Sequence, residues 1–566
     1  MKTLLLVLSV LFFSHSLSAQ SWTWHWGSNI GSGIEDEDPK VATDGNDNVI
    51  VAGLYLSEIT VGDDTWPTPY NTDRHIIIVK YDADGNILWS SSIGGDLDGP
   101  QSSSHVVYDI ATDADGNVYL AGFLGNNATM CGVEIGNTHK GSFLAKINSD
   151  GTYAWNVLTA EQYLNDMMQA LHVDAAGNSY VGVKGDVSLA YDFGGVTPSG
   201  EDDAIDPRAA IFKVDPDGNT LWGLLLDTTR PLHIATDSEG DILVSTYHNQ
   251  GGPDEAGHYL VKVDGENQEI LWTRYAFSNA TGTSHTDLGL YVKSDNSIIQ
   301  YFNIGSGGLI DFGNGFVTGG GPGNYLGYLL HIDADGSTLS MEAMVDNFQE
   351  ENNTLSFNSF AAIDDENFYL VGDLNGETVL SDGTAIVASP NIFGIAGKNV
   401  LVFKVDEELN ITGIATQTGS SNHEAFDVAV LSNGDAMVAG LFETTTHPFF
   451  GEGTFLIPDN VISNGDDDIF ITRVTTGELE GNSVSESAEF EYQLYPNPAQ
   501  ENTRISSASS INRLEVLDLT GKLINSISIK DALSYDLNLN TFSNGIYFIK
   551  VYSGAGVSTR KLIVRH

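Results

Sequence analysis

Short apolar runs separated by polar turns recur along most of the chain. The clearest copy, residues 110–122, reads IATDADGNVYLAG, in which two apolar runs flank a polar turn that contains Gly116. Alternating apolar positions around a Gly- or Asn-containing turn are typical of a β-hairpin. We expect Gly116, and Gly177 in a second copy, to take the left-handed conformation that such turns need. The other copies begin 56 to 70 residues apart and make seven in all, at 41–53, 171–183, 234–246, 290–302, 360–372 and 428–440.

A second hairpin motif follows the first in most repeats. It reads VKYDADGNILW at 79–89, and related segments occur at 145–155, 212–222, 261–272, 330–340 and 403–413. Each repeat therefore holds four strands, called A to D in chain order. Four-stranded units repeated at this period predict a β-propeller. Trp89 and its counterparts fall on strand D, the outermost strand, where the blades diverge and leave room for large side chains. An open solenoid of the same hairpins is the alternative.

The seventh repeat lacks a strand D of its own. Residues 469–474 resemble a strand C, but no strand with a tryptophan follows them. The missing strand is expected at the other end of the chain, where segment 21–27 contains Trp24 and Trp26 and resembles the strand D segments. We therefore predict an all-β fold with a seven-bladed β-propeller over residues 20–474, closed by the N-terminal strand. Such closure removes the open sheet edges that invite aggregation.

The two faces of such a propeller differ in their connections. The A–B and C–D turns lie on one face and are short, whereas the B–C and D–A connections lie on the other and are long and varied. Binding residues concentrate on variable loops held by a rigid scaffold. Several B–C loops contain a stretch marked by Gly or an aromatic residue, such as 192–195, 311–313 and 449–451. These stretches are predicted either as small extra hairpins or as simple caps of the blades.

The two alternating motifs resemble the SBBP-type β-propeller repeats of secreted bacterial proteins. The resemblance covers about residues 21–474. It implies the propeller fold and leaves the activity open, because that family is not tied to one activity.

The N-terminus has the features of an export signal. Lys2 is followed by an apolar run over residues 4–13 and then by small residues ending at Ala19. A cationic start, a short apolar core and small residues before a cleavage site predict a secretory signal peptide over residues 1–19. The run is too short to span a bilayer, and no later segment of the sequence is apolar for the roughly 18 residues that a span needs. We therefore expect no transmembrane segment in the mature chain.

Composition changes near the C-terminus. Residues 475–492 are polar, acidic and aperiodic, which predicts a linker. Residues 493–566 hold eight Lys and Arg against five Asp and Glu, a net charge of +3, whereas residues 20–492 hold 15 against 71, a net charge of −56. Strand patterns at 514–519 and 545–551 predict a separate small antiparallel β-sandwich in the tail.

The tail closely resembles the type A C-terminal sorting domain of the type IX secretion system. Its four matching elements, in chain order, are Tyr495, Pro496, Asn497 and Pro498; residues 518–522 with Gly521 and Lys522; residues 544–548 with Gly545 and Tyr547; and Lys561 with Leu562. The resemblance implies recognition by the type IX secretion machinery and export across the outer membrane, usually with removal of the tail. Attachment to the cell surface or release into the medium would follow.

Composition also narrows the chemistry. The chain has 24 Lys and Arg against 76 Asp and Glu, a net charge of −52, so we expect no nucleic-acid partner. The single cysteine, Cys131, excludes an intramolecular disulfide and a cysteine-based zinc site. The Asp-x-Asp-Gly segments, such as 82–85 and 113–116, favour plain turns over calcium loops, because they lack the further carboxylates of an EF-hand. We expect no metal and no other cofactor.

No catalytic residue is predicted, because the sequence contains no nucleophile elbow, P-loop or dinucleotide motif. His172 and His233 fall at the start of A strands and either face the channel or pack in the core. We predict a non-enzymatic, monomeric, secreted or surface-attached propeller that binds an extracellular protein or glycan through its long-loop face. The alternative is an extracellular hydrolase acting on glycans in the propeller channel. Carboxylates or histidines converging in the channel would favour the hydrolase, and an apolar or sealed channel would favour a binding or structural role.

Overall fold

The computed structural model describes most of the chain. The described residues are 23–32, 36–68, 74–94, 105–125, 128–135, 141–159, 167–185, 192–200, 208–248, 257–278, 285–304, 309–311, 317–319, 326–343, 354–375, 377–379, 385–387, 398–418, 423–443, 449–450, 455–456, 467–475, 492–497, 499–500, 502–517, 523–539, 542, 545–553 and 556–565. The chain divides into two compact units, residues 1–477 and residues 478–566. The signal peptide predicted at 1–19 lies outside the described residues, as does most of the linker predicted at 475–492, so both remain predictions.

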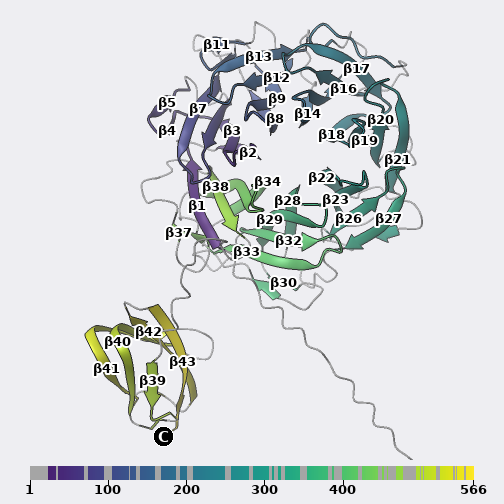
Figure 1. The fold of residues 1–566 in the computed structure, drawn as a ribbon. Coiled ribbons are helices and arrows are strands. Elements are labelled where there is room, and N and C mark those ends of the chain that lie inside the picture. Colours follow the sequence, from purple (N-terminus) through teal and green to yellow (C-terminus); the bar gives the residue numbers. More distant parts are fainter. Residues whose placement is uncertain are drawn as a thin grey trace, which may run out of the picture. The chain divides into compact units, whose positions relative to one another are not determined.

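The first unit is a ring of blades, each built on four antiparallel strands, and the described residues form seven of them (Figure 1). This arrangement confirms the predicted seven-bladed β-propeller. The innermost strands, A, are β2 (Glu37–Thr43), β8 (Val106–Thr112), β14 (Met167–Val173), β18 (Arg230–Thr236), β22 (His285–Val292), β28 (Thr354–Ala362) and β34 (His423–Val430). The B strands are β3 (Val49–Tyr55), β9 (Val118–Leu124), β15 (Ser179–Gly185), β19 (Ile242–His248), β23 (Ile298–Ile304), β29 (Asn367–Asn375) and β35 (Ala436–Glu443).

The outer half of each blade consists of strands C and D. The C strands are β6 (His75–Tyr81), β12 (Gly141–Ile147), β16 (Arg208–Val214), β20 (Gly257–Val263), β26 (Leu326–Ile332), β32 (Lys398–Asp406) and β38 (Asp467–Thr475). The D strands are β7 (Ile87–Gly94), β13 (Tyr153–Leu158), β17 (Thr220–Leu226), β21 (Ile270–Ser278), β27 (Thr338–Ala343), β33 (Ile411–Thr418) and β1 (Thr23–Ile30). Blades 1 to 6 begin with β2, β8, β14, β18, β22 and β28, and blade 7 combines β34, β35 and β38 with β1.

Burial explains the apolar pattern of the strands. Every residue of β3 and β6 is buried, because the middle strands of a blade are covered on both faces by the neighbouring blades. Strand β7, at the rim, begins with exposed Ile87 and Leu88. Continuous apolar runs such as VIVAGLY therefore mark strands B and C, and mixed patterns mark the outer strand.

The hairpin turns are held by their own aspartates. Asp113 Oδ1 accepts hydrogen bonds from the main-chain N–H groups of Asp115, at 3.1 Å, and of Asn117, at 3.0 Å. Gly116 and Gly177 adopt φ values of 77° and 80°, as predicted, which a residue with a Cβ takes at a cost. These local bonds explain why the turn sequence recurs so regularly along the chain.

The N-terminal strand closes the ring, as predicted. Strand β1 pairs antiparallel with β38, with Ile30 opposite Ile469, so the purple start of the described chain lies beside yellow-green β38 (Figure 1). The first and last strands of the propeller thus share blade 7. Closure by hydrogen bonding covers the edge of β38 that would otherwise be exposed.

Small hairpins in three of the B–C loops attach a blade to the one before it. The hairpin of β10 (Thr129–Met130) and β11 (Val133–Glu134) pairs with β7, the outer strand of the preceding blade. The hairpin of β24 (Leu309–Asp311) and β25 (Val317–Gly319) pairs with β21, and that of β36 (Phe449–Phe450) and β37 (Phe455–Leu456) pairs with β33. Two more hairpins lie in B–C loops, β4 (Ile59–Val61) with β5 (Asp64–Trp66) and β30 (Glu377–Val379) with β31 (Ala385–Val387). These loops were predicted either as small extra hairpins or as simple caps of the blades. The segments at residues 311 and 449–450 belong to extra hairpins.

The second unit is a small all-β domain. Its strands are β39 (Tyr492–Tyr495), β40 (Asn502–Leu517), β41 (Leu523–Asn538), β42 (Gly545–Ser553) and β43 (Gly556–Val564), joined in one antiparallel sheet. The pairing of the long strand β40 with β41 shifts register between Ser506 and Arg513. Ile505 and Leu514, from the two halves of β40, lie in the same buried cluster, so the bent sheet encloses its own core.

The central channel as the candidate functional site

Each innermost strand contains a β-bulge near its beginning. The pairing of strands A and B shifts register between Val107 and Asp109 in β8 and between Pro231 and His233 in β18. Equivalent shifts occur in the other five A strands. A bulge leaves one residue out of the ladder and redirects the side chains beside it. Residues at or beside the bulge of every A strand line a cavity in the central channel.

This channel cavity has a volume of about 380 Å³. Its charged and imidazole side chains are Lys40, Asp109, Arg230, His233, Asp287 and Asp427. Because every A strand begins at a D–A connection, the cavity lies in the half of the channel nearer the long-loop face. The channel is thus neither apolar nor sealed by hydrophobic side chains, and carboxylates and a histidine do converge there. Its size falls within the range of small-molecule sites, about 300–1,000 Å³.

Two of the channel carboxylates link neighbouring blades. Asp109 Oδ2 on β8 accepts a hydrogen bond from the main-chain N–H of Leu171 on β14, at 2.9 Å. Asp427 Oδ2 on β34 accepts the N–H of Val41 on β2, also at 2.9 Å, and its Oδ1 accepts the Ser359 hydroxyl, at 2.8 Å. Both carboxylates therefore link the A strands of neighbouring blades. This structural role does not require a ligand.

Asp287 and His233 form a second polar group in the wall. Asp287 accepts hydrogen bonds from the hydroxyl of Ser245 and from Gln300 Nε2, the latter at 2.7 Å. His233 Nε2 lies 3.2 Å from the main-chain oxygen of Asp287. His233 lines the channel cavity and is also within hydrogen-bond distance of the wall, so it combines the two predicted positions, facing the channel and being hydrogen-bonded. His172 Nε2 instead lies 3.0 Å from Thr236 Oγ1, and burial lowers the pKa of His172 to about 4, so it is a packed histidine between blades.

Burial shifts the acidity of two of these carboxyl groups. It raises the pKa of Asp109 to about 6, although the Lys40 ammonium and the Leu171 amide act to lower it. Burial also raises the pKa of Asp287, against the lowering influence of His233 and of its hydrogen-bond donors. A carboxyl group with a pKa near 6 can exchange a proton close to neutral pH, which is a property of a general acid. This observation keeps the hydrolase alternative in view.

Two cations line the cavity, Lys40 and Arg230. Arg230 is the first residue of its A strand, β18, whereas Lys40 lies further along β2. Arg230 is exposed, and among the described residues it forms no salt bridge. Two acids at the start of other A strands do have basic partners. Glu37, the first residue of β2, binds Arg74 at 2.7 Å, and Glu424, the second residue of β34, binds Lys398. Arg230, at the start of β18, therefore lacks the oppositely charged partner that these two acids have. No sequence motif indicated this feature.

The opposite face carries a repeated buried ion pair. Lys80 Nζ on strand C of blade 1 lies 2.8 Å from Asp44 Oδ2 in the A–B turn, and the two side chains are 2% and 0% exposed. Hydrogen bonds from Lys80 and Asn48 hold the pKa of Asp44 below its usual value, although burial acts to raise it. The same pairing recurs in other blades as Lys146–Asp113, Lys262–Asp237 and Arg473–Asp435. The basic residue of the strand C motif was visible in the sequence, but its role was missed.

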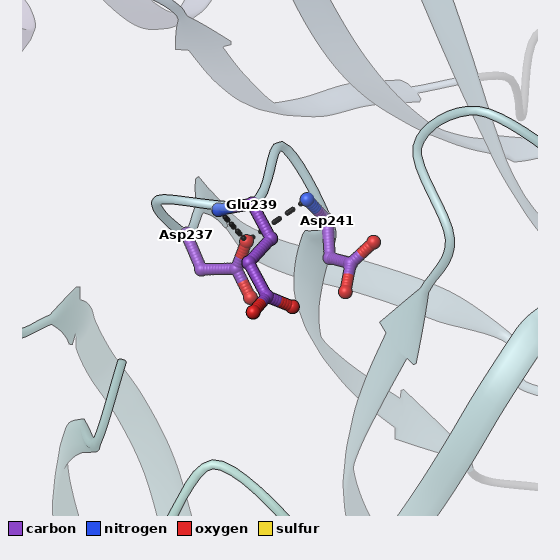
Figure 2. Close-up of side chains that lie close together, drawn as sticks. All are labelled: Asp237, Glu239 and Asp241. Carbon is purple, nitrogen blue, oxygen red and sulfur yellow. Dashed lines mark hydrogen bonds between the residues drawn. The ribbon is translucent and has the colours of Figure 1, made fainter. Parts of the chain in front are cut away.

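One acidic cluster in the described residues has metal-like spacing, formed by Asp237, Glu239 and Asp241 in the A–B turn of blade 4 (Figure 2). The carboxylates of its two aspartates already have partners. Asp237 Oδ1 accepts the N–H groups of Glu239 and Asp241, both at 2.9 Å. Lys262 Nζ lies 2.7 Å from Asp237 Oδ2 and 3.3 Å from Asp241 Oδ2. The cluster therefore corresponds to the A–B turn and lysine–aspartate ion pair of other blades. We do not propose a metal site there.

The predicted closure residues lie on β1. Trp26 Nε1 donates a hydrogen bond to the main-chain oxygen of Ala83, at 2.9 Å, in the C–D turn of blade 1. Its ring lies on Gly85, whose φ of 86° and missing Cβ allow the contact, since a Cβ there would come within 2.7 Å of the ring. Tryptophans at three other junctions make the same bond to the next blade, namely Trp89 to Ser149, Trp155 to Pro216 and Trp272 to Ala334. The side chain of Trp24 lies outside the described residues, so its role remains a prediction.

The predicted sorting residues lie in the second unit. Asn497 Nδ2 donates to the main-chain oxygen of Lys561, at 2.7 Å, and Asn497 Oδ1 accepts the N–H of Ile563, at 2.9 Å. The fold thus brings the first and last elements of the predicted motif together. Tyr495 is 80% exposed, and Pro496 beside it is exposed as well.

The remaining sorting residues are spread over the domain. Gly545 begins β42, and the ring of Tyr547 on the same strand packs edge-on against Phe542. Pro498, Gly521 and Lys522 lie outside the described residues. Which of these side chains the export machinery recognises remains a prediction.

The family comparison bears on the second unit. Residues 493–565 match the family described as secretion system C-terminal sorting domain. The chain is therefore a β-propeller protein with a type IX secretion sorting domain, and it is exported to the cell surface or secreted. The tail accordingly interacts with the secretion machinery. Nowhere in the described residues is there a helix long and apolar enough to cross a membrane.

Other relatives are distant. An uncharacterized WD repeat-containing protein of Acanthamoeba polyphaga mimivirus is 31% identical over 119 residues, which make up 18% of this chain and only 8% of that protein. A protein of unknown function from Bacteroides caccae is 11% identical, with a TM-score of 0.31 over 60% of this chain and 89% of its own. PorZ, a surface component of the type IX secretion system of Porphyromonas gingivalis, is 12% identical, with a TM-score of 0.22 over 93% and 81% of the chains. The WD40 β-propeller domain of Doa1 is 12% identical, with a TM-score of 0.31 over 81% and 94%.

Proposed function

We propose that this protein is a non-enzymatic binding protein, which captures an extracellular protein or glycan on its long-loop face, around the mouth of the channel cavity. Side chains from all seven A strands converge on one polar cavity of about 380 Å³, as expected for the hydrolase, so the observation that carries the binding proposal is how its carboxylates are held. Its carboxylates are engaged by donors in the wall, as in the bond from the Leu171 amide to Asp109. Carboxylates held in this way shape a binding pocket and are poorly placed to transfer protons.

The proposal assigns a role to each part of the chain. Residues 1–19 direct the chain across the inner membrane, residues 20–474 bind the ligand as a monomer, residues 475–492 act as a linker, and residues 493–566 direct export. Trp24 and Trp26 close the ring. The exposed residues around Tyr495 and Lys561 belong to the surface that the secretion machinery recognises.

The second candidate is an extracellular hydrolase acting on glycans. It is supported by the carboxyl group of Asp109, whose pKa burial raises to about 6 in the wall of the cavity. A hydrolase of this kind needs two carboxyl groups about 5–10 Å apart, with the acid free to reach the glycosidic oxygen. Asp109 uses one oxygen for Leu171 and the other for the N–H of Ile110, at 2.9 Å, which favours binding over catalysis.

The experiment is a glycan and surface-protein array screened with the secreted full-length protein and with two variants. Leu232→Arg places a bulky charge in the cavity lining and should abolish binding of the captured ligand. Asp335→Asn, in an exposed C–D turn on the opposite face, is the matched control and should bind as the wild type does. Equal thermal unfolding curves would show that both variants are folded.

Three outcomes decide between the candidates. Binding that Leu232→Arg removes and Asp335→Asn preserves supports the proposal. Release of reducing sugar from an array glycan, abolished by Asp109→Asn, would replace it with the hydrolase. Binding that survives Leu232→Arg would show that the ligand does not use the channel mouth.

A further inference from the structure

We infer that the channel cavity binds the terminal acidic sugar of an otherwise neutral glycan, and that Arg230 holds the carboxylate of that sugar. The inference rests on the proposed binding function and names its ligand class. It starts from the position of Arg230 in the lining of the cavity, where the residue is exposed overall, its guanidinium is partly desolvated, and no salt bridge joins it to a carboxylate among the described residues.

The surroundings of Arg230 differ from those of the arginines of the propeller that bind carboxylates. Burial lowers the pKa of Arg230, and the two groups that act to raise it are the hydroxyls of Tyr247 and Tyr108, neither of which is a carboxylate. By contrast, Arg74 binds Glu37 and Arg473 binds Asp435, at 2.7 and 2.6 Å. Residues 20–492, the propeller with its linker, carry a net charge of −56, so an exposed arginine without an acidic partner is a specific feature that calls for an anionic ligand.

The carboxylates of the cavity do not neutralise Arg230, because they face the wall. Asp427 accepts the Val41 N–H and the Ser359 hydroxyl, and Asp287 accepts the Gln300 amide. Lys40 lies near Asp109 and lowers its pKa, so the charge of Lys40 is largely balanced. Arg230 is left with a planar fork of donors that matches a carboxylate in two parallel hydrogen bonds.

The rest of the cavity suits a single sugar ring at the end of a chain. Tyr108, Leu232, Phe360 and Phe426 supply aromatic and apolar surface beside the charged groups, as sugar-sized ligands require. The acidic body argues against a polyanion, because the propeller would repel its further charges. One carboxylate at a chain end places its charge at Arg230 and leaves neutral sugars towards the acidic loop face.

The test is isothermal titration calorimetry of the full-length protein with two matched pairs of sugars. Cellobiouronic acid and cellobiose differ by one carboxylate, and 3′-sialyllactose and its sialic acid methyl ester differ by the charge of one carboxylate. We expect the acidic member of at least one pair to bind about tenfold or more tightly than the neutral one, since a charge-assisted bidentate bond has that strength. Raising the salt concentration should weaken the acidic sugar selectively.

Two variants test the role of Arg230 itself. Arg230→Gln should remove the preference for the acidic sugar and leave the weaker affinity for the neutral sugar. Arg274→Gln is the matched control, because Arg274 lies on the outer strand β21 of the same blade and donates to the Thr338 hydroxyl. It should leave both affinities unchanged.

The outcomes separate this inference from the proposed function. Equal affinity for acidic and neutral sugars, or a preference that survives Arg230→Gln, would overturn the acidic-sugar site. The peptide acetyl-Ala-Ala has a free terminal carboxylate but no sugar. If this peptide binds more tightly than either acidic sugar, the choice of a glycan as the ligand is overturned. In each of these cases, an array ligand whose binding is abolished by Leu232→Arg would still support a binding role at the channel mouth. If the array also yields no such ligand, the proposed function fails with the inference.

Discussion

A buried lysine on strand C joins the inner and outer halves of blade 1. Lys80 Nζ contacts Asp44 Oδ2 at 2.8 Å and donates to the main-chain oxygen of Gly116 in blade 2, also at 2.8 Å. The aspartate in turn accepts the N–H groups of Asn46 and Asn48, which form the turn. One charged pair therefore fixes a turn, a strand and a blade junction together. Its contribution depends on both partners being present, because a buried charge without its partner is costly.

Replacing Lys80 with methionine should lower the free energy of unfolding by about 3–5 kcal/mol, because Asp44 would remain buried without its partner. The double variant Lys80→Met with Asp44→Asn should lose less than the single variant. Lys213→Met is the control, since Lys213 lies at the same position of blade 3 over the Tyr180 ring, at 5.0 Å, and should cost about 1 kcal/mol. Urea unfolding measures all three, and equal losses for Lys80 and Lys213 would contradict the ion-pair argument.

The pKa of Asp109 gives the propeller a measurable pH dependence. Because burial raises its pKa to about 6 in the folded state, the folded protein binds this proton more tightly than the unfolded chain does. Its contribution to stability is therefore present at pH 4 and lost as the pH rises through 6, by up to about 3 kcal/mol. The difference in unfolding free energy between the wild type and Asp109→Asn, measured from pH 4 to 7, should fall accordingly. A difference that stays constant over this range would show that Asp109 titrates normally.

At the scale of the elements, the sequence predicts the blades well because their signals are local. The turn aspartates bond within their own hairpins, as Asp113 does, and each outer tryptophan reaches the next blade from the same strand position. The bulges of the A strands had no such signal. The residue after the bulge is Lys40, Asp109 or His233 in different blades, without shared chemistry. The channel cavity arises from packing around the axis, so apart from His233, for which the channel was one of two predicted positions, its members were not predicted from the sequence.

Removing residues 21–27 should expose the edge of β38 and make the propeller aggregate, because these residues supply half of its pairing with β1. Trp26→Ala should cost about 2–3 kcal/mol, below the value for a fully buried aromatic residue, since Trp26 is half-buried. Trp89→Ala is the matched control, because it removes the same contact at a junction within the continuous chain. It should lower stability to a similar extent without aggregation. Thermal unfolding followed by light scattering tests this, and a soluble, equally stable deletion variant would contradict closure by β1.

At the scale of the whole molecule, two units share one chain whose charge is distributed unevenly. Residues 20–492, which include the repeats, carry a net charge of −56, whereas residues 493–566 carry +3. Each unit has its own buried cluster, with residues such as Ile78 in the first and Leu514 in the second. Separate cores let one unit be removed while the other stays folded. The division therefore suits a tail that serves export and a propeller that functions after it.

The sorting role of the tail leads to a test in a host that has the type IX secretion system. Truncation after Tyr492 removes the family match at residues 493–565 and leaves the propeller intact, so the chain should fold but remain in the periplasm, where its predicted signal peptide alone would take it. Fusing residues 475–566 to a neutral passenger that carries a signal peptide should send that passenger to the surface or the medium. The same passenger without the tail is the control. Cell fractionation, with mass spectrometry of the C-terminus, should find surface protein that lacks most of the tail. A truncated chain that still reaches the surface, or surface protein that still ends at His566, would contradict this role, because export and removal both depend on recognition of the second unit.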